Sequence, residues 1–195
     1  MMEHENRRRS APKQWTVRRL EECFEEIEDF EQPKIALEQY ATPPHIAALV
    51  INAIDSTYGD FHGKLVADLG CGTGRLTVGS ILCGAEQVYG IDIDQSAIQL
   101  ASQNMISVFS EEEDSLIDAY RACGQFNFIL ADIASCEYDR FWLPFNNLFD
   151  TVMMNPPFGT KNNRGLDMVF LKRGIEISKN TVYSLHKTST REVSI

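Results

Sequence analysis

The chain has 195 residues, of which 44% are hydrophobic and 24% are charged, a composition that fits one globular domain with a sizeable core. It holds no apolar run as long as a membrane span, and its Arg-rich start lacks the apolar stretch of a signal peptide. The five cysteines form no C-x-x-C pair and no Cys/His group with zinc spacing. We therefore expect an intracellular protein with free thiols, no membrane contact and no bound metal.

The formal net charge of −10 is unusual for a nucleic-acid-binding protein, but the charge is unevenly spread. Residues 1–20 carry six Lys or Arg against two acidic residues, and residues 151–195 carry seven against three. A phosphate-facing edge built from these two segments is compatible with an acidic total. Ordinary solvated faces would explain the same pattern equally well.

The N-terminal part predicts an arm followed by two helices. Residues 1–14 are polar, basic and without periodicity, so we expect a disordered arm, with the folded domain over residues 15–190 and a short tail at 191–195. Apolar residues at helical spacing predict a helix over residues 15–30. Thr42 followed by two prolines is a good helix start, and an apolar stripe continues that second helix to about Tyr58.

A glycine loop follows the first predicted strand. Residues 64–69 read as a buried strand, residues 70–74 have the sequence Gly-Cys-Gly-Thr-Gly, and a helical pattern runs from Arg75 to about Leu82. Glycines let a backbone approach a ligand closely, and the start of the next helix presents free N–H groups. This strand–turn–helix unit is typical of a cofactor site.

The next predicted strand, residues 87–91, ends at Asp92, which can accept hydrogen bonds from the two ribose hydroxyls of a nucleoside-bearing cofactor. A nicotinamide-binding fold uses the same logic. Its G-x-G-x-x-G fingerprint, however, requires glycine where this chain has Arg75. The loop spacing that begins at Gly70, preceded by Asp68, instead suits a cofactor without a pyrophosphate.

The middle of the chain predicts a helix over residues 95–105 and then an acidic surface segment over residues 106–125. A third strand over residues 126–130 runs into Asp132, which can hold the exocyclic amine of a cofactor adenine; a helix-cap or turn role fits Asp132 equally well. Residues 134–148 are rich in aromatics and are expected to be an insertion packed by its own rings.

The tetrad Asn155-Pro156-Pro157-Phe158 follows a predicted strand over residues 149–154. The Asn155 side-chain oxygen and the Pro156 carbonyl can accept the two N–H bonds of a planar amine, while Phe158 stacks on the base. The tetrad therefore favours alkylation of an amine at the carboxyl end of a strand. In the simpler alternative, the prolines end the strand and Asn155 caps the next helix.

Beyond the tetrad, the pattern predicts a helix over residues 166–178 and a fifth strand over residues 181–185. His186 follows that strand. It could act as a general base, although a lone histidine at a strand end is usually structural.

Taken together, these motifs resemble the eukaryotic methyltransferase-like family that methylates one adenosine of small-subunit ribosomal RNA. The resemblance spans roughly residues 20–190. The segments that carry it are Gln39-Tyr40-x-Thr42-x-Pro44-His45-Ile46-Ala47, Asp68-Leu69-Gly70-Cys71-Gly72, Ile91-Asp92-Ile93-Asp94, the tetrad with residues 153–163, and Val182-Tyr183-Ser184-Leu185-His186-Lys187.

The resemblance implies an α/β, Rossmann-like class I methyltransferase fold with a doubly wound, mostly parallel sheet. It implies S-adenosylmethionine as the methyl donor, and the tetrad as the catalytic group acting on a flipped-out adenine. The expected cofactor-binding residues are Gln39, Thr42, Asp68, Gly70, Gly72, Thr73, Arg75, Asp92, Asp132 and Ile133.

The resemblance also implies partners. The family works as a heterodimer with a small zinc-binding activator subunit, and strand addition at the edge of residues 126–130 would be the physical form of that contact. It implies 18S ribosomal RNA as the substrate, and location in the nucleus and cytoplasm. The family's sheet has two further strands that we expect this chain to lack, which would make it an alternative or incomplete product.

The predicted reaction is methylation of the exocyclic amine of an adenosine in 18S ribosomal RNA. Two alternatives remain open. A protein-glutamine methyltransferase would use the same tetrad, because an amide NH2 fits it. A catalytically inactive, truncated form would still bind the donor and the activator subunit.

Overall fold

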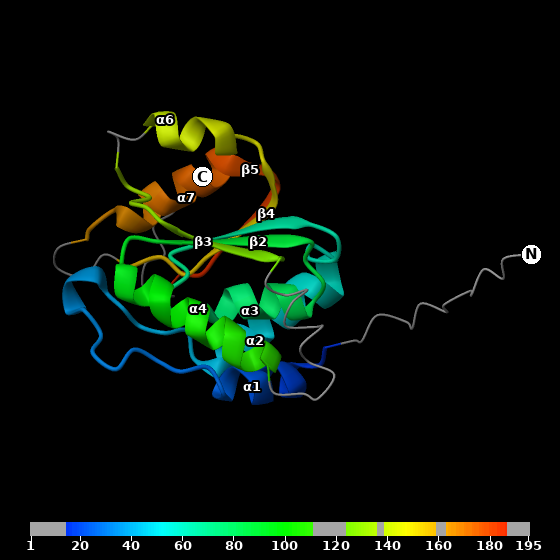
Figure 1. Ribbon diagram of the computed structural model, residues 1–195. Coiled ribbons are helices and arrows are strands. Elements are labelled where there is room, and N and C mark those ends of the chain that lie inside the picture. The colour runs from blue at the N-terminus through cyan, green and yellow to red at the C-terminus, as the bar shows by residue number, and fades with distance from the viewer. Residues whose placement is uncertain (1–14, 111–123, 136–138, 159–162, 187–195) are drawn as a thin grey trace, which may run out of the picture.

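The computed structural model describes most of the chain as one α/β unit (Figure 1). The predicted basic arm, the C-terminal tail and most of the acidic segment lie outside the described residues. The described ranges are 15–110, 124–135, 139–158 and 163–186.

The centre is a five-stranded sheet in the order β3-β2-β1-β4-β5. Every strand pairing in the described sheet is parallel, which confirms the predicted doubly wound fold. The order runs outward from β1 in both directions, so the topological switch point lies between β1 and β4. The strands are β1 (Leu65–Leu69), β2 (Gln87–Asp92), β3 (Phe126–Leu130), β4 (Phe149–Met154) and β5 (Ser178–Ser184).

Helices cover both faces of the sheet (Figure 1). One face carries α1 (Val17–Glu25), α2 (Pro44–Ala53), α3 (Arg75–Leu82) and α4 (Gln95–Ser110). The other face carries α6 (Asp139–Trp142) and α7 (Leu166–Ile177). Shorter turns of helix are η1 (Ile35–Leu37), η2 (Ile54–Tyr58) and η3 (Leu143–Phe145).

Each face has its own apolar core. Phe24, Ile51 and Met105 belong to the apolar core on the face that carries α1 to α4. On the other face, Trp142 is only 1% exposed, and the neighbouring Phe145 ring stacks on Phe149 with centroids 5.9 Å apart. The rings of Phe141, Trp142 and Phe145 also contact one another, so the aromatic segment is packed by its own rings, as predicted, and it also forms part of the core.

Three predicted boundaries differ from the structure. The first helix ends at Glu25 rather than near residue 30, and two residues later the carbonyl of Ile27 accepts a hydrogen bond from Arg75 instead of from a helical N–H. Helix α4 continues beyond residue 105 to Ser110. Strand β5 begins at Ser178, directly after α7, three residues earlier than predicted.

The described part of the chain lacks two kinds of binding feature. No helix there is both long and apolar enough to cross a membrane. No group of three or more His, Cys, Asp or Glu there has the arrangement to hold a metal ion.

Candidate active site

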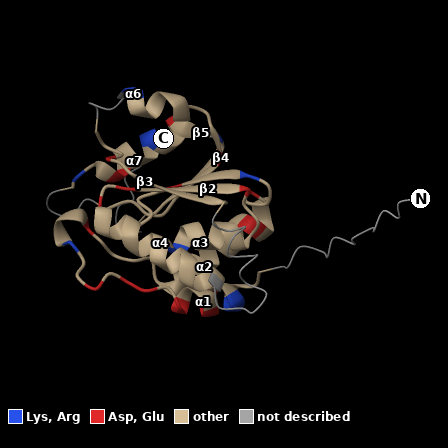
Figure 2. Ribbon diagram, viewed as in Figure 1, with Lys and Arg blue, Asp and Glu red and all other residues tan. Residues whose placement is uncertain are grey.

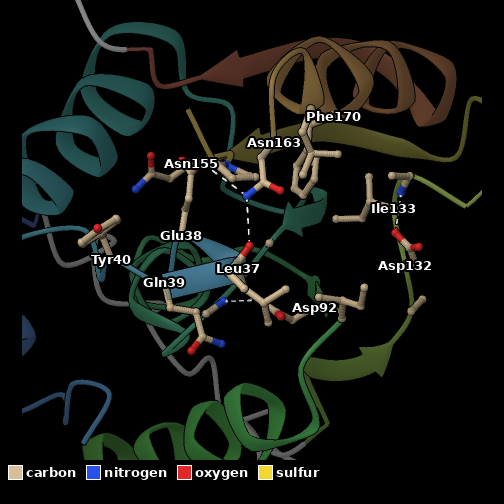
Figure 3. A pocket seen from close by; sticks show the side chains of 18 of the residues that line it. Leu37, Glu38, Gln39, Tyr40, Asp92, Asp132, Ile133, Asn155, Asn163 and Phe170 are labelled. Carbon is tan, nitrogen blue, oxygen red and sulfur yellow. Dashed lines mark hydrogen bonds between the residues drawn. The ribbon is translucent and has the colours of Figure 1, made fainter. Parts of the chain in front are cut away.

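The carboxyl ends of four neighbouring strands open into one cavity of about 310 Å³ (Figure 3). This is the position that ligands take in open α/β sheets. The structure brings many of the predicted residues together there. Those that line the cavity are Gly70 and Gly72 after β1, Asp92 on β2, Asp132 and Ile133 after β3, Asn155 and Pro157 after β4, and Gln39.

The floor of the cavity is the glycine loop. Gly70 and Gly72 have φ angles of +72° and +54°, in the left-handed region that side chains rarely adopt. A Cβ atom on Gly70 would also lie 3.0 Å from the ring of Phe170. The bare backbone of this loop therefore suits close contact with a cofactor.

Asp92 closes the loop from the neighbouring strand. One carboxylate oxygen accepts a hydrogen bond from the Gly72 N–H at 3.0 Å, and the other accepts from the Asp94 N–H at 2.9 Å. Burial raises the pKa of Asp92, and these backbone donors oppose that rise. Because each oxygen keeps a second lone pair, the carboxylate can still accept from two vicinal hydroxyls.

Asp132 stands at the far end of the cavity beside buried Ile133 (Figure 3). Its carboxylate accepts a hydrogen bond from the Ala134 N–H at 2.8 Å, an Asx-type turn. Asp132 therefore makes a turn bond, as one of the two alternatives predicted, and it also lines the cavity. Ile133 adds an apolar surface of the kind that holds a flat heterocycle.

A strap over the cavity is formed by residues 34–40. The Gln39 amide donates to Asp94 at 2.6 Å and accepts from the Lys34 N–H at 2.8 Å, and the Lys34 ammonium lies 2.5 Å from the Asp94 carboxylate. Burial alone would raise the pKa of Asp94, but the hydrogen bonds from Lys34 and Gln39 lower it to about 2. Gln39, a predicted cofactor contact, thus lines the cavity with its amide already engaged in protein bonds.

The other side of the strap is tied to the segment that follows the tetrad. The Asn163 amide donates to the carbonyl of Ala36 at 3.1 Å and to the Glu38 carboxylate at 3.3 Å (Figure 3). Asn163 and Phe170, which also line the cavity, were not predicted. A polar loop residue and an apolar helix residue carry no local signal for such a role.

A smaller cleft adjoins the cavity at the switch point. It is lined by Asp68, Thr73, Arg75, Thr42 and Asn155 among others. Asp68 is fully buried; one carboxylate oxygen accepts from the Thr77 hydroxyl at 2.7 Å, while the other lacks a partner within the described residues. Burial raises the pKa of Asp68 to about 7. An unpaired buried carboxylate oxygen is the group that an incoming ammonium would satisfy.

Two further predicted cofactor residues have protein partners in this cleft. The Arg75 side chain is 3% exposed, and its guanidinium donates to the carbonyl of Thr42 at 2.6 Å, to the carbonyl of Ile27 at 3.1 Å and to Asp29 at 2.9 Å. Thr73 is buried, and its carbonyl accepts from the Asn104 amide at 2.9 Å. The hydrogen bonds of both residues thus support the architecture of the site.

The tetrad lies where β4 ends. The Asn155 amide nitrogen donates to the Thr42 hydroxyl at 2.9 Å, whereas its carbonyl oxygen is buried and unpaired among the residues described. Pro156 is buried, Pro157 lines the cavity and Phe158 is half-buried. The next helix, α7, begins at Leu166 with Gly165 at its cap position, so the alternative in which Asn155 caps it is wrong.

Two similar proteins of known name are both called rRNA N(6)-adenosine-methyltransferases. A zebrafish (Danio rerio) protein named rRNA N(6)-adenosine-methyltransferase METTL5 is 40% identical over 176 residues, which are 90% of this chain and 76% of the relative. The fruit-fly (Drosophila melanogaster) protein of the corresponding name is 45% identical over 175 residues, 90% of this chain and 74% of the relative.

Two other comparisons agree on the fold. A crystal structure from Pyrococcus horikoshii, described as a candidate RNA methyltransferase, is 32% identical with a TM-score of 0.70, covering 90% of this chain and 75% of that chain. The family model for ribosomal protein L11 methyltransferase (PrmA) matches residues 45–135. That match contains the glycine loop, Asp92 and Asp132, but ends before the tetrad.

Proposed function

The chain belongs to the family of rRNA N6-adenosine methyltransferases, and we propose from this that it transfers a methyl group from S-adenosylmethionine to the exocyclic amine of an adenosine in ribosomal RNA. The observation that carries the proposal is the unpaired carbonyl oxygen of Asn155, beside the cavity at the end of β4. Such an atom costs about 1–3 kcal/mol when it is left without a partner. A substrate N–H would supply that partner.

The residues of the cavity and its adjoining cleft fit the donor. The unpaired Asp68 oxygen can accept from its ammonium, the bare backbone at Gly70 and Gly72 allows close approach, and Asp92 can bind its ribose hydroxyls. Asp132 and Ile133 can hold its adenine. When bound, the donor supplies a methyl group on a positively charged sulfur.

The tetrad supplies positioning. An adenine amine is a poor nucleophile, because its lone pair is delocalised into the ring. Hydrogen bonds from its two N–H groups to the Asn155 oxygen and the Pro156 carbonyl favour a pyramidal nitrogen, with its lone pair aimed at the methyl group. Stacking on Phe158 holds the base in that pose. The nitrogen–carbon bond forms as the carbon–sulfur bond breaks, and the amine then loses a proton to solvent.

The substrate within ribosomal RNA is proposed to be the 18S species. Positive charge in residues 151–195, the part of the chain that contains the tetrad and the helix after it, supports contact with phosphates on the tetrad side. Acidic residues gather along α1 and the segment after it, on the face of the sheet that carries α1 to α4 (Figure 2). RNA would avoid that face. Because 18S RNA is made in the nucleus and used in the cytoplasm, both compartments are proposed for the protein.

A small zinc-binding activator subunit is proposed as the partner, with β3 as its docking strand. Strand β3 lies at one edge of the described sheet, and Leu130 at its end is 51% exposed. An unpaired edge of this kind accepts an added strand through main-chain hydrogen bonds.

Methylation of protein glutamine remains the alternative function. The L11 methyltransferase model names a protein substrate but no glutamine, and its match, residues 45–135, holds the proposed donor-binding positions and not the tetrad. An inactive form that binds only the donor and the activator is the other alternative.

The test is transfer of radiolabelled methyl groups to ribosomes from which the modification is absent, with RNA and protein fractions counted separately. Label in an adenosine of 18S RNA is expected, and Asn155→Ala should reduce it by at least about 100-fold while donor affinity changes little. Label confined to protein would overturn the RNA assignment. Donor binding without label in either fraction would support the inactive form.

A further inference from the structure

Asn155 is held by a residue from a distant part of the chain. Its amide nitrogen donates to the hydroxyl of Thr42 at 2.9 Å, across 113 positions of sequence. Thr42 is 8% exposed and belongs to no helix or strand. The position of its hydroxyl therefore depends on what anchors the irregular segment that follows α1.

Arg75 provides that anchor. Its guanidinium binds the carbonyls of Thr42 and Ile27 and the carboxylate of Asp29, near both ends of the segment between α1 and α2. A cation at the first position of α3 is unfavourable for the helix dipole. The three acceptors offset that cost, and they fix the backbone from which the Thr42 hydroxyl projects.

We propose that Thr42, anchored by Arg75, is a positioning residue that orients the Asn155 amide for methyl transfer. The Thr42 hydroxyl occupies the donor side of the amide, which leaves the acceptor side for the substrate amine. An Asn155 amide turned by 180° would place its own NH2 group against the NH2 group of the substrate, and it could not accept a hydrogen bond from the substrate. The inference rests on the proposed function for its catalytic consequence, whereas the contact itself can be tested in the free protein.

The test uses two substitutions at Thr42 and a matched control. Thr42→Val keeps the shape and removes the hydroxyl, and Thr42→Ser restores it. Thr151→Val is the control, because Thr151 is also buried and donates its hydroxyl to the Asp60 carbonyl at 2.7 Å, on β4 but away from the cavity. Both valine variants lose one buried hydroxyl and its hydrogen bond. A difference between them is therefore due to where the lost hydroxyl lies, beside Asn155 or away from it.

The first readout is the side-chain amide signal of Asn155 in 15N NMR spectra of the donor-free protein, identified by its absence in Asn155→Asp. Thr42→Val should shift the signal and speed its hydrogen exchange by about 10-fold, because the amide has lost its acceptor. Thr42→Ser and Thr151→Val should leave it near the wild-type position. An unchanged signal in Thr42→Val would overturn the proposal even if the protein proved inactive on RNA.

The second readout separates the turnover number from donor binding. Thr42→Val should lower kcat at saturating substrates by about 10- to 100-fold, with recovery in Thr42→Ser, while the Kd for S-adenosylhomocysteine stays within about 3-fold. Weaker binding of S-adenosylhomocysteine with an unchanged kcat would mean that Thr42 only contacts the methyl donor, and it would refute the positioning role. If the wild-type protein does not methylate RNA, the proposed function fails and the NMR result still decides the contact.

Discussion

At the scale of single residues, the site depends on buried polar atoms that the folded chain leaves unsatisfied. Asp68 and Asn155 each have one side-chain oxygen without a partner in the described structure, in the cleft that both residues line. Proteins rarely leave such atoms unpaired, since each costs about 1–3 kcal/mol. These two oxygens, at the carboxyl end of the sheet, are therefore the atoms for which a bound ligand would supply the missing hydrogen-bond partners.

Asp68 predicts a pH dependence. Its pKa is raised to about 7 from an ordinary value of 3.8, so the folded state keeps its proton over a range where the unfolded state has lost it. The Asp68 contribution to stability is therefore full below pH 3.8 and is lost as pH rises to about 7. Thermal unfolding measured across this pH range should therefore show a smaller fall in stability for Asp68→Asn than for the wild type. Some fall should remain in the variant, because the pKa of Asp92 is also raised.

The same group predicts proton release on donor binding. An ammonium beside Asp68 favours its ionised form, so binding of S-adenosylhomocysteine at pH 6 should release a proton that is not released at pH 8. Calorimetry in two buffers of different ionisation enthalpy measures this release directly. Equal proton release in wild type and Asp68→Asn would refute the ammonium contact.

At the scale of elements, the strap of residues 34–40 joins the donor side of the cavity to the substrate side. Asp94 holds one side through Lys34 and Gln39, and Asn163 holds the other through Glu38. Its η1 turn is capped at its C-terminal end by Glu38, whose φ of +50° is rare for a residue with a side chain. The hydrogen bonds on both sides maintain this unfavourable conformation.

The strap predicts a graded loss of donor affinity. Asp94→Asn removes the ion pair with Lys34 and should raise the Kd for S-adenosylhomocysteine about 10-fold, because a charge-assisted bond is worth roughly 1.5–3 kcal/mol. Glu22→Gln is the control; it breaks an exposed ion pair with Arg18 on α1 and should change nothing. Equal Kd values in the two variants would show that the strap does not retain the donor.

At the scale of the whole molecule, the sheet ends in β3 on one side and β5 on the other. If the activator docks on β3, Leu130→Lys should weaken the complex by at least about 10-fold, since a charge then enters an apolar contact. Ile175→Lys is the matched control, because Ile175 is 60% exposed on α7, over the opposite half of the sheet. Titration of the two purified subunits measures the effect, and equal weakening by both variants would exclude β3 as the docking strand.

The sequence predicted the five strands, their parallel arrangement and the meeting of Gly70, Asp92, Asp132 and Asn155 at one edge. It could do so because parallel strands place their carboxyl ends together, whatever the connections between them. It did not predict the protein contacts of Arg75 or the ties of the strap. Those bonds join residues 33 to 127 positions apart, so they leave no trace in local periodicity or spacing.

The position of the switch point has an evolutionary consequence. The residues proposed to bind the methyl donor lie at the ends of β1, β2 and β3, whereas the tetrad follows β4, on the other side of the place where the strand order reverses. Mutations in the second half that spare the residues lining the cavity can therefore alter the methyl acceptor while the proposed donor-binding residues stay unchanged. A lineage can change its target in this way and retain its source of methyl groups, so RNA-modifying and protein-modifying enzymes can share one ancestral half.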